Sequence, residues 1–336
     1  MPEPTLAAAV EVVLLDLDGT VYAGGRPVPG AAPAVAACRE AGVDVRFVTN
    51  NASLPPEDVA EHLGRVDVPA RPDEVRTSSQ AGALLVREAC GEGARVLAVG
   101  GPGVAGALTD AGLVPVTSAD DAPVAVLQGF GPRVGWAELT EAAYAVRAGA
   151  LWVATNTDAT LPRERGPAIG NGSLVAAVRN ATGAVPRVAG KPEAPLLLAA
   201  AEGRPALVVG DRLDTDVAGG HAAGLPTLWV STGVDVAATV VAAPPEHRPT
   251  HLGADLGALL EPPAAVDRDE DGPAVTWASG GARVRVEDDV LTAGDGGTPL
   301  ELLRALCAAA WERADAGRPV DVPAEVLGRL APLDAR

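Results

Sequence analysis

Lysine, cysteine and bulky side chains are scarce in this sequence of 336 residues. Lys191 is the only lysine, and the other 25 of the 26 basic residues are arginine. The three cysteines, Cys38, Cys90 and Cys307, are scattered without CxxC spacing, which excludes a disulfide framework and favours free thiols in a reducing cytosol. Phe, Tyr and Met number only 2, 2 and 1. The core must therefore come from Ala, Val and Leu, as suits an α/β protein.

Positive charge and long apolar runs are also missing. The formal net charge of −18 argues against nucleic acid or an anionic membrane surface as a partner. No run reaches the ~18 apolar residues of a membrane span. The apolar stretch 6–15 is interrupted by Glu11 and follows no basic residue, so we interpret it as a buried strand and not as a signal segment.

Strand and helix patterns alternate along the chain. The predicted strands lie at 10–18, 43–51, 206–211 and 225–233, and the helices that follow or precede them lie at 31–41, 193–202 and 214–223. This alternation predicts a parallel sheet with right-handed crossovers. Active sites of such sheets lie outside the carboxyl ends of the strands, and the polar residues of this sequence collect there.

The first of these ends reads DLDGT, residues 16–20. Asp16 and Asp18 point to the same side of an extended segment, roughly 7 Å apart along the chain. Two close carboxylates repel unless a cation or a proton joins them, and magnesium prefers oxygen ligands. An isolated DxD is also typical of a helix cap or surface turn, but DLDGT directly after an apolar strand favours a site.

Three further motifs with polar residues follow along the chain. Thr49, in FVTNN, offers a hydroxyl beside amides that can form an anion-binding nest, although a Thr-Asn turn explains the same letters. Lys191 begins a helix, where a cation and the helix N-terminus can meet one anion. Asp211 leaves the strand in GDRLDTD and Asp216 lies a turn later, whereas Asp214 also fits a helix N-cap.

Together these motifs resemble the haloacid dehalogenase superfamily of phosphohydrolases, whose set runs DxDGT, strand-Thr, lone Lys and GDxxxTD. The core of the resemblance covers roughly residues 10–260. It implies a phosphatase in which Asp16 is the nucleophile that becomes an aspartyl phosphate. Asp18 would protonate the leaving alkoxide and then activate water. Family branches that break carbon–halogen or carbon–phosphorus bonds lack the second aspartate, so Asp18 favours hydrolysis of a phosphate monoester.

The resemblance also implies the ligands of metal and phosphate. Magnesium would be held by Asp16, the backbone carbonyl of Asp18, and Asp211. Asp216 would lie next to these ligands without binding the ion directly. Thr49 and the amides of Asn50 and Asn51 would bind phosphoryl oxygens. Lys191 would offset the repulsion between carboxylate and phosphate, a place that the planar guanidinium of arginine fits poorly.

Spacing then predicts where a substrate-selecting cap is inserted. Only 33 positions separate Asp16 from Thr49, whereas 141 residues lie between Thr49 and Lys191 and show a second α/β alternation. This resembles the large α/β cap of the branch that contains 4-nitrophenylphosphatases, phosphoglycolate phosphatases and pyridoxal phosphatases. The cap motifs TNTDATLP (155–162) and GPAIGNGSL (166–174) also match.

The cap sequence bears on the substrate. We expect Asn156, Asp158 and Leu161 to line the specificity loop. Leu161 stands about where pyridoxal phosphatases have a histidine, which favours small aliphatic esters such as glycerol 3-phosphate or 2-phosphoglycolate. Arg163 and Arg165 would meet a substrate carboxylate or else remain solvated loop charges.

The C-terminal part departs from most cap-bearing relatives. Residues 261–273 read as a proline- and acid-rich linker, followed by strands at 274–279 and 282–288 and a helix at 299–314. This unit resembles the degenerate acetyltransferase-like appendage of actinobacterial glycerol 3-phosphate phosphatases. It has no glycine-rich loop for coenzyme A, so docking or oligomerisation is a better expectation than acetyl transfer.

The sequence therefore predicts a Rossmann-like parallel-sheet core (1–78 and 186–260), an inserted α/β cap (79–185) and a small α+β C-terminal domain after a linker (261–336). The predicted activity is magnesium-dependent hydrolysis of glycerol 3-phosphate, with 2-phosphoglycolate or a broad 4-nitrophenylphosphatase activity as alternatives. A phosphotransferase is the alternative of another class, and a non-catalytic binding protein is disfavoured because the whole motif set is present. We expect a cytoplasmic protein, and the family resemblance adds a homodimer through the cap.

Overall fold

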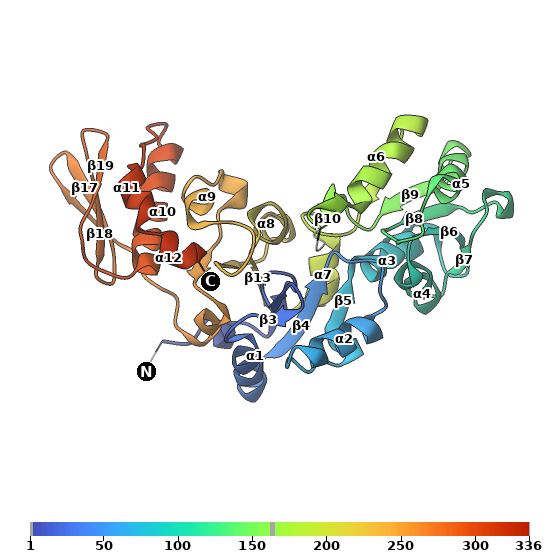
Figure 1. The fold of residues 1–336 in the computed structure, drawn as a ribbon, viewed down its shortest axis with the longest axis horizontal. Coiled ribbons are helices and arrows are strands. Elements are labelled where there is room, and N and C mark those ends of the chain that lie inside the picture. Colours follow the sequence, from blue (N-terminus) through green and yellow to red (C-terminus); the bar gives the residue numbers. More distant parts are fainter. Residues whose placement is uncertain (1–2, 162–164, 336) are drawn as a thin grey trace. The chain divides into compact units, whose positions relative to one another are not determined.

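The computed structural model describes residues 3–161 and 165–335 (Figure 1). Arg163 lies outside the described residues. The chain divides into two compact units: unit 1 is Met1–Val45 with Arg204–Arg336, and unit 2 is Arg46–Gly203. The three domains expected from the sequence, with boundaries at 78/79, 185/186 and 260/261, stay a prediction.

Unit 1 contains parallel strands in the order β15-β14-β13-β1. Every residue of β1, β13 and β14 is buried, because apolar residues fill both faces of these strands. This arrangement confirms the predicted Rossmann-like character. The strands are β1 (Val12–Leu15), β13 (Ala206–Gly210), β14 (Thr227–Val230) and β15 (His251–Gly253), and the connecting elements include α1 (Ala31–Glu40), the hairpin β2 (Tyr22–Ala23) and β3 (Arg26–Pro27), α8 (Ala218–Ala223) and α9 (Ala237–Val241).

The C-terminal part of unit 1 is an antiparallel sheet with the order β16-β17-β18-β19, and α10 lies along one of its faces (Figure 1). Thr298 caps α10 by accepting a hydrogen bond from the Glu301 N–H. The elements are β16 (Asp267–Asp271), β17 (Ala274–Ser279), β18 (Ala282–Glu287), β19 (Val290–Ala293), α10 (Pro299–Asp315), α11 (Ala324–Gly328) and α12 (Ala331–Asp334).

Strand β16 was not expected, because its sequence DRDED lies in the stretch interpreted as a linker. All of its residues are exposed, and it is held by antiparallel pairing of its backbone with β17. Charged residues are a usual protection of an edge strand against pairing with other chains. The linker interpretation therefore fits at most the residues before Asp267.

Unit 2 contains a second parallel sheet, in the order β12-β9-β8-β6-β7. Strand β4 enters this unit and pairs in parallel with β5. The strands are β4 (Asp44–Thr49), β5 (Val75–Thr77), β6 (Arg95–Val99), β7 (Val114–Val116), β8 (Ala125–Gln128), β9 (Leu151–Ala154), β10 (Thr160–Leu161), β11 (Ala168–Ile169) and β12 (Arg187–Val188). The helices are α2 (Pro56–Arg65), α3 (Ser78–Cys90), α4 (Pro102–Asp110), α5 (Trp136–Arg147), α6 (Asn171–Thr182) and α7 (Pro195–Ala201).

None of the helices in the described part of the chain combines the length and apolar character that crossing a bilayer requires.

The buried face of α10 generates a stability prediction. Leu303 is fully buried, so Leu303→Ala should lower the free energy of unfolding by about 2–5 kcal/mol through lost burial and a residual cavity. Leu198→Ala is the matched control, because Leu198 in α7 is 50% exposed and its truncation should change stability by less than about 1 kcal/mol. Denaturant titration measures both, and equal losses would show that α10 does not pack as described.

Candidate active site

The nucleophile candidate Asp16 follows β1 directly. Its N–H donates to the Val209 carbonyl over 2.9 Å and so continues the pairing of β1 with β13. In the register of that pairing Leu15 lies opposite Val209. Asp16 and Asp211 therefore emerge from neighbouring strands at the same edge of the sheet, as expected from parallel pairing.

Asp211 is fully buried and is held from several directions. The Val234 N–H donates to its Oδ2 over 2.6 Å, and the Thr20 hydroxyl donates to Oδ1 over 3.4 Å. A Cβ atom at Gly19 or Gly233 would overlap the carboxylate, so glycine at these positions lets the backbone approach it. This packing fixes the carboxylate before any ligand arrives.

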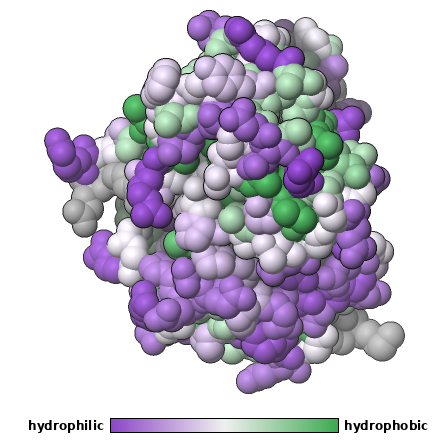
Figure 2. Space-filling view, turned by 90° about the vertical axis from the view of Figure 1, so that its right-hand side faces the viewer, coloured by the Kyte–Doolittle hydropathy of each residue, from purple (hydrophilic) through white to green (hydrophobic). Residues whose placement is uncertain are grey.

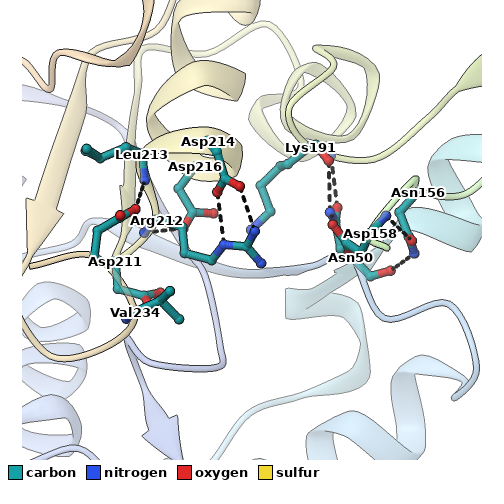
Figure 3. Close-up of polar contacts among 11 residues, drawn as sticks. Asn50, Asn156, Asp158, Lys191, Asp211, Arg212, Leu213, Asp214, Asp216 and Val234 are labelled. Carbon is teal, nitrogen blue, oxygen red and sulfur yellow. Dashed lines mark hydrogen bonds and ion pairs between the residues drawn. The ribbon is translucent and has the colours of Figure 1, made fainter. Parts of the chain in front are cut away.

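Asp216 completes a group of three carboxylates. Asp16, Asp211 and Asp216 each offer an oxygen within 4.8 Å of the others. Among the described residues, they are the one group of three or more His, Cys, Asp or Glu side chains close enough to share a metal ion. Asp216 lies in the π-type turn Leu213–Val217, and its Oδ2 accepts the Arg212 N–H over 3.1 Å (Figure 3). Clustered carboxylate oxygens repel one another and are the ligands of hard divalent cations. The group therefore fits the predicted metal set Asp16 and Asp211 with Asp216 near them.

Asp214 does not cap the helix, which was one interpretation of its place in the sequence. The N-cap position of the turn is Arg212, and the Asp214 carboxylate instead accepts the Arg212 guanidinium over 2.8 and 3.0 Å (Figure 3). The Asp214 side chain is 59% exposed and that of Arg212 is 37% exposed, so water screens this ion pair and it contributes little to stability.

Asp18 is exposed on the loop that leads into β2. The Gly19 N–H donates to the Tyr22 carbonyl over 2.7 Å, and Gly19 has a positive φ of 88°, which favours glycine in this turn. Burial, followed by the charges of Asp18 and Asp16, raises the pKa of the Tyr22 phenol. Sequence reasoning missed Tyr22; the signal available was an aromatic residue four positions after Asp18.

In unit 2, Thr49 ends β4 with a buried side chain, and its Oγ1 accepts the Asn51 N–H over 3.1 Å. The amide expected to bind phosphate at Asn51 thus already has an acceptor. Lys191 is also buried, and its ammonium donates to the Val48 carbonyl over 3.4 Å. The structure brings Thr49 and the lone lysine to the same strand end, as the motif order predicts.

Asn50 links Lys191 to the predicted specificity residues. Its Oδ1 accepts the Lys191 N–H over 2.9 Å, while its Nδ2 donates to the Lys191 carbonyl over 2.9 Å and to Asp158 Oδ2 over 3.2 Å (Figure 3). Asn156 Nδ2 donates to the Asn50 carbonyl over 2.7 Å. The side chain of Asn50 is therefore a structural connection, beyond the role expected for its amide.

Asn156 and Asp158 also bond to each other, since Asn156 Oδ1 accepts the Asp158 N–H over 3.2 Å. Leu161 is half-buried in β10 and pairs with Ala168. Asn171, which sequence reasoning missed, is buried and donates from Nδ2 to the Asn156 carbonyl over 2.7 Å. The signal available was its place in the cap motif GPAIGNGSL.

Asn50 and its neighbour generate a matched pair of variants. Asn50→Asp removes two donated bonds and sets a negative charge beside Asp158, so it should lower the free energy of unfolding by about 2 kcal/mol or more. Asn51→Asp keeps the Oδ1 atom that accepts the Ser53 N–H and hydroxyl, and should change stability by about 0.5 kcal/mol or less. Chemical denaturation compares them, and an Asn50 variant as stable as the Asn51 variant would contradict the assigned connection.

Comparison with known proteins gives the same assignment along the chain. A model of haloacid dehalogenase-like hydrolases matches residues 13–114, a HAD-hydrolase-like model matches 188–259, and a model of a GCN5-related N-acetyltransferase-like domain matches 279–331. D-glycerol 3-phosphate phosphatase of Mycobacterium tuberculosis is 46% identical over 320 residues, which cover 92% of this chain and 88% of that protein. An acid sugar phosphatase of Staphylococcus aureus is 38% identical over 226 residues, which cover 66% of this chain and 86% of the phosphatase.

Solved structures agree. The crystal structure of glycerol phosphate phosphatase from Mycobacterium tuberculosis in complex with magnesium has a TM-score of 0.84 and 41% identity, covering 98% of this chain and 99% of that one. The 4-nitrophenylphosphatase of Thermotoga maritima has a TM-score of 0.70 and 30% identity, covering 76% of this chain and 98% of its own. The chain belongs to the haloacid dehalogenase-like hydrolases.

Proposed function

We propose that this protein is a magnesium-dependent phosphatase of small phosphate monoesters, with glycerol 3-phosphate as its first candidate substrate. The observation that carries the proposal is the group of three carboxylates at the ends of β1 and β13, one of them the motif aspartate Asp16. The 46% identity to a glycerol 3-phosphate phosphatase supports both the reaction and the substrate.

Asp16 and Asp18 carry the chemistry in this proposal. A carboxylate oxygen of Asp16 forms a bond to phosphorus while the ester P–O bond breaks, and Asp18 donates a proton to the departing alkoxide. In the second step Asp18 takes a proton from water, whose oxygen bonds to phosphorus as the aspartyl P–O bond breaks. Phosphate leaves and Asp16 is restored as a carboxylate.

Mg²⁺ would be held by Asp16, the backbone carbonyl of Asp18, and Asp211. Asp216 would lie next to these ligands without binding the ion directly. Bound there, Mg²⁺ supplies positive charge that offsets the charge of the phosphoryl group. The fit rests on the oxygen-only donor set and on the buried, hydrogen-bonded carboxylate of Asp211.

Lys191, Thr49 and the amides of Asn50 and Asn51 are proposed to bind phosphoryl oxygens, with the Asn51 N–H exchanging its bond to Thr49 Oγ1 for the phosphoryl group. Lys191 supports this role because its ammonium is held in a buried environment, where a point charge acts more strongly than in water. It is also the lysine that remains in a chain whose other 25 basic residues are arginine. Electrostatic interactions of this kind contribute several kcal/mol to phosphoryl transfer.

The substrate alternatives are 2-phosphoglycolate and a broad activity on esters such as 4-nitrophenyl phosphate, the latter favoured by the similarity to 4-nitrophenylphosphatase. Asn156, Asp158 and Leu161 are proposed to select among them from the cap. A phosphotransferase would differ in product, because it yields a new ester in place of inorganic phosphate.

The cap at 79–185 is proposed to mediate a homodimer as well. Its support is exposed apolar surface on this part, including Trp136 and Tyr144 on α5, which are 83% and 59% exposed. Figure 2 views the molecule from the right-hand side of Figure 1 and shows small groups of green, hydrophobic side chains among purple, hydrophilic ones. The proposed location is the cytoplasm, consistent with three cysteines that form no disulfide.

The nucleophile assignment predicts the behaviour of Asp16→Asn. This variant should keep its fold and lose turnover by at least about 1000-fold, because an amide oxygen is a far weaker nucleophile than a carboxylate. Phosphate release and circular dichroism measure the two properties. Asp214→Asn, which changes an exposed acid of the Arg212 ion pair, should retain activity. Substantial turnover by the Asp16 variant would exclude the aspartyl-phosphate mechanism.

The substrate assignment predicts a ranking of kcat/KM. With Mg²⁺, glycerol 3-phosphate should exceed 2-phosphoglycolate, pyridoxal phosphate and 4-nitrophenyl phosphate by about a hundredfold, or about 2.7 kcal/mol of transition-state discrimination. Phosphate release is measured for each ester with Asp16→Asn as the blank. Turnover confined to 4-nitrophenyl phosphate would leave the chemistry intact and refute the substrate.

A further inference from the structure

The C-terminal segment, residues 267–335, shares one hydrophobic core with the parallel sheet whose strand β13 ends just before Asp211. Trp229 of β14 and Leu213 of the π-type turn belong to this core, together with buried residues of α9, of the antiparallel sheet and of α10. The indole N–H of Trp229 donates to the Asp211 carbonyl over 3.0 Å. The appended elements therefore pack into the same core as Trp229, which hydrogen-bonds to the backbone of Asp211.

Direct hydrogen bonds join the C-terminal helices to α9. The Trp311 indole N–H is shared between the Val240 and Val241 carbonyls, at 3.3 and 3.2 Å. Asp334 Oδ1 accepts the Ala237 N–H, the first residue of α9, over 2.9 Å. With only five residues, α9 is too short to be stable by itself, so these contacts hold it in place.

The loop that precedes α9 holds the carboxylate group from the other side. Val234 donates its N–H to Asp211 Oδ2 (Figure 3). The side chain of the next residue, Asp235, accepts the Leu213 N–H at its Oδ2 over 2.7 Å. Gly233 lies against the Asp211 carboxylate, where no Cβ atom has room. Residues 231–241 thus form a short continuous segment with Asp211 at one end and the C-terminal helices at the other.

A second set of contacts ties the region after α9 to α10. Arg248 donates from Nε to the Ala243 carbonyl over 3.1 Å and from Nη1 to Asp315 over 2.7 and 2.8 Å. Its guanidinium also lies over the Trp311 ring, 5.5 Å from the centroid. The C-terminal helices therefore contact the chain both at α9 and in the region that follows it.

We propose that the C-terminal segment positions the metal-binding carboxylate Asp211 by clamping residues 231–241, with Trp311 and Asp334 as positioning residues. This rests on the proposed function in taking Asp211 as a metal ligand. The segment is thereby part of the apparatus that sets the affinity of the site for a divalent cation, and it needs no acetyltransferase chemistry to do so.

The test compares two identical substitutions, Trp311→Phe and Trp277→Phe. Each removes an indole hydrogen bond, but Trp277 donates to Glu312 inside the C-terminal segment, whereas Trp311 donates to α9. Mn²⁺ is the probe, because carboxylate sites that suit magnesium also take it. Its dissociation constant is measured without substrate by electron paramagnetic resonance of the free ion, and thermal midpoints are measured in EDTA.

Trp311→Phe should raise the Mn²⁺ dissociation constant by about three- to tenfold, the effect of losing the partly buried indole hydrogen bond to α9. The Mg²⁺ concentration for half-maximal turnover should rise by the same factor, while kcat at saturating Mg²⁺ changes little. Trp277→Phe should lower the thermal midpoint but leave the Mn²⁺ constant unchanged. Equal shifts in both variants, or none in Trp311→Phe, would overturn the clamp.

Asp334→Ala and Glu325→Ala form a second pair in case a tryptophan variant does not fold. Both acids are exposed in the last helices, and only Asp334 bonds to α9 among the contacts described. Asp334→Ala should weaken Mn²⁺ binding about two- to threefold, and equal binding by both variants would refute its role. Wild-type protein that binds Mn²⁺ but releases no phosphate would refute the proposed function alone; wild-type protein that binds no Mn²⁺ would refute the clamp.

Discussion

Asp211 is a carboxylate without solvent exposure, and much of unit 1 is arranged to make that burial tolerable. An ionised group removed from water costs several kcal/mol unless hydrogen bonds and opposite charge replace its hydration. The Val234 N–H and the Thr20 hydroxyl replace part of it, and the glycines at 19 and 233 let the backbone come close. Asp16 and Asp216 add negative charge at the same place, so the group as a whole favours binding a cation.

Unit 2 solves a related problem around a positive charge. Lys191 is buried and lies on a backbone fixed by Asn50, which uses both its acceptor and its donor on the same residue. Because Asn50 Nδ2 also reaches Asp158, and the Asn50 carbonyl accepts Asn156, the lysine is connected to the loop expected to contact substrate. A change of the Asn50 amide would therefore act on the lysine proposed to bind phosphate and on the proposed specificity loop together.

The parallel sheets, and the acids that follow their strands, could be predicted from the sequence because both depend on local patterns. Apolar runs gave β1 and β13, and acids directly after them gave Asp16 and Asp211. The sequence did not predict β16, whose five charged residues form a strand only because β17 offers a backbone to pair with. Nor did it identify Tyr22 or Asn171, since their significance comes from neighbours distant in the chain or across a turn. The three domain boundaries and the chemical roles of the site residues stay predictions.

The shared core of unit 1 shows why an appended domain need not carry a reaction of its own. The hydrogen bonds from α10 and α12 to α9 connect the appended domain to the loop beside Asp211. Trp229 contacts the Asp211 backbone and belongs to the core that α10 completes, while Trp311 and Asp334 hold the turn of chain that supplies Val234. A divalent-cation site is sensitive to small movements of its ligands. Selection on the affinity of that site would therefore act on α10 and α12, although neither provides a ligand.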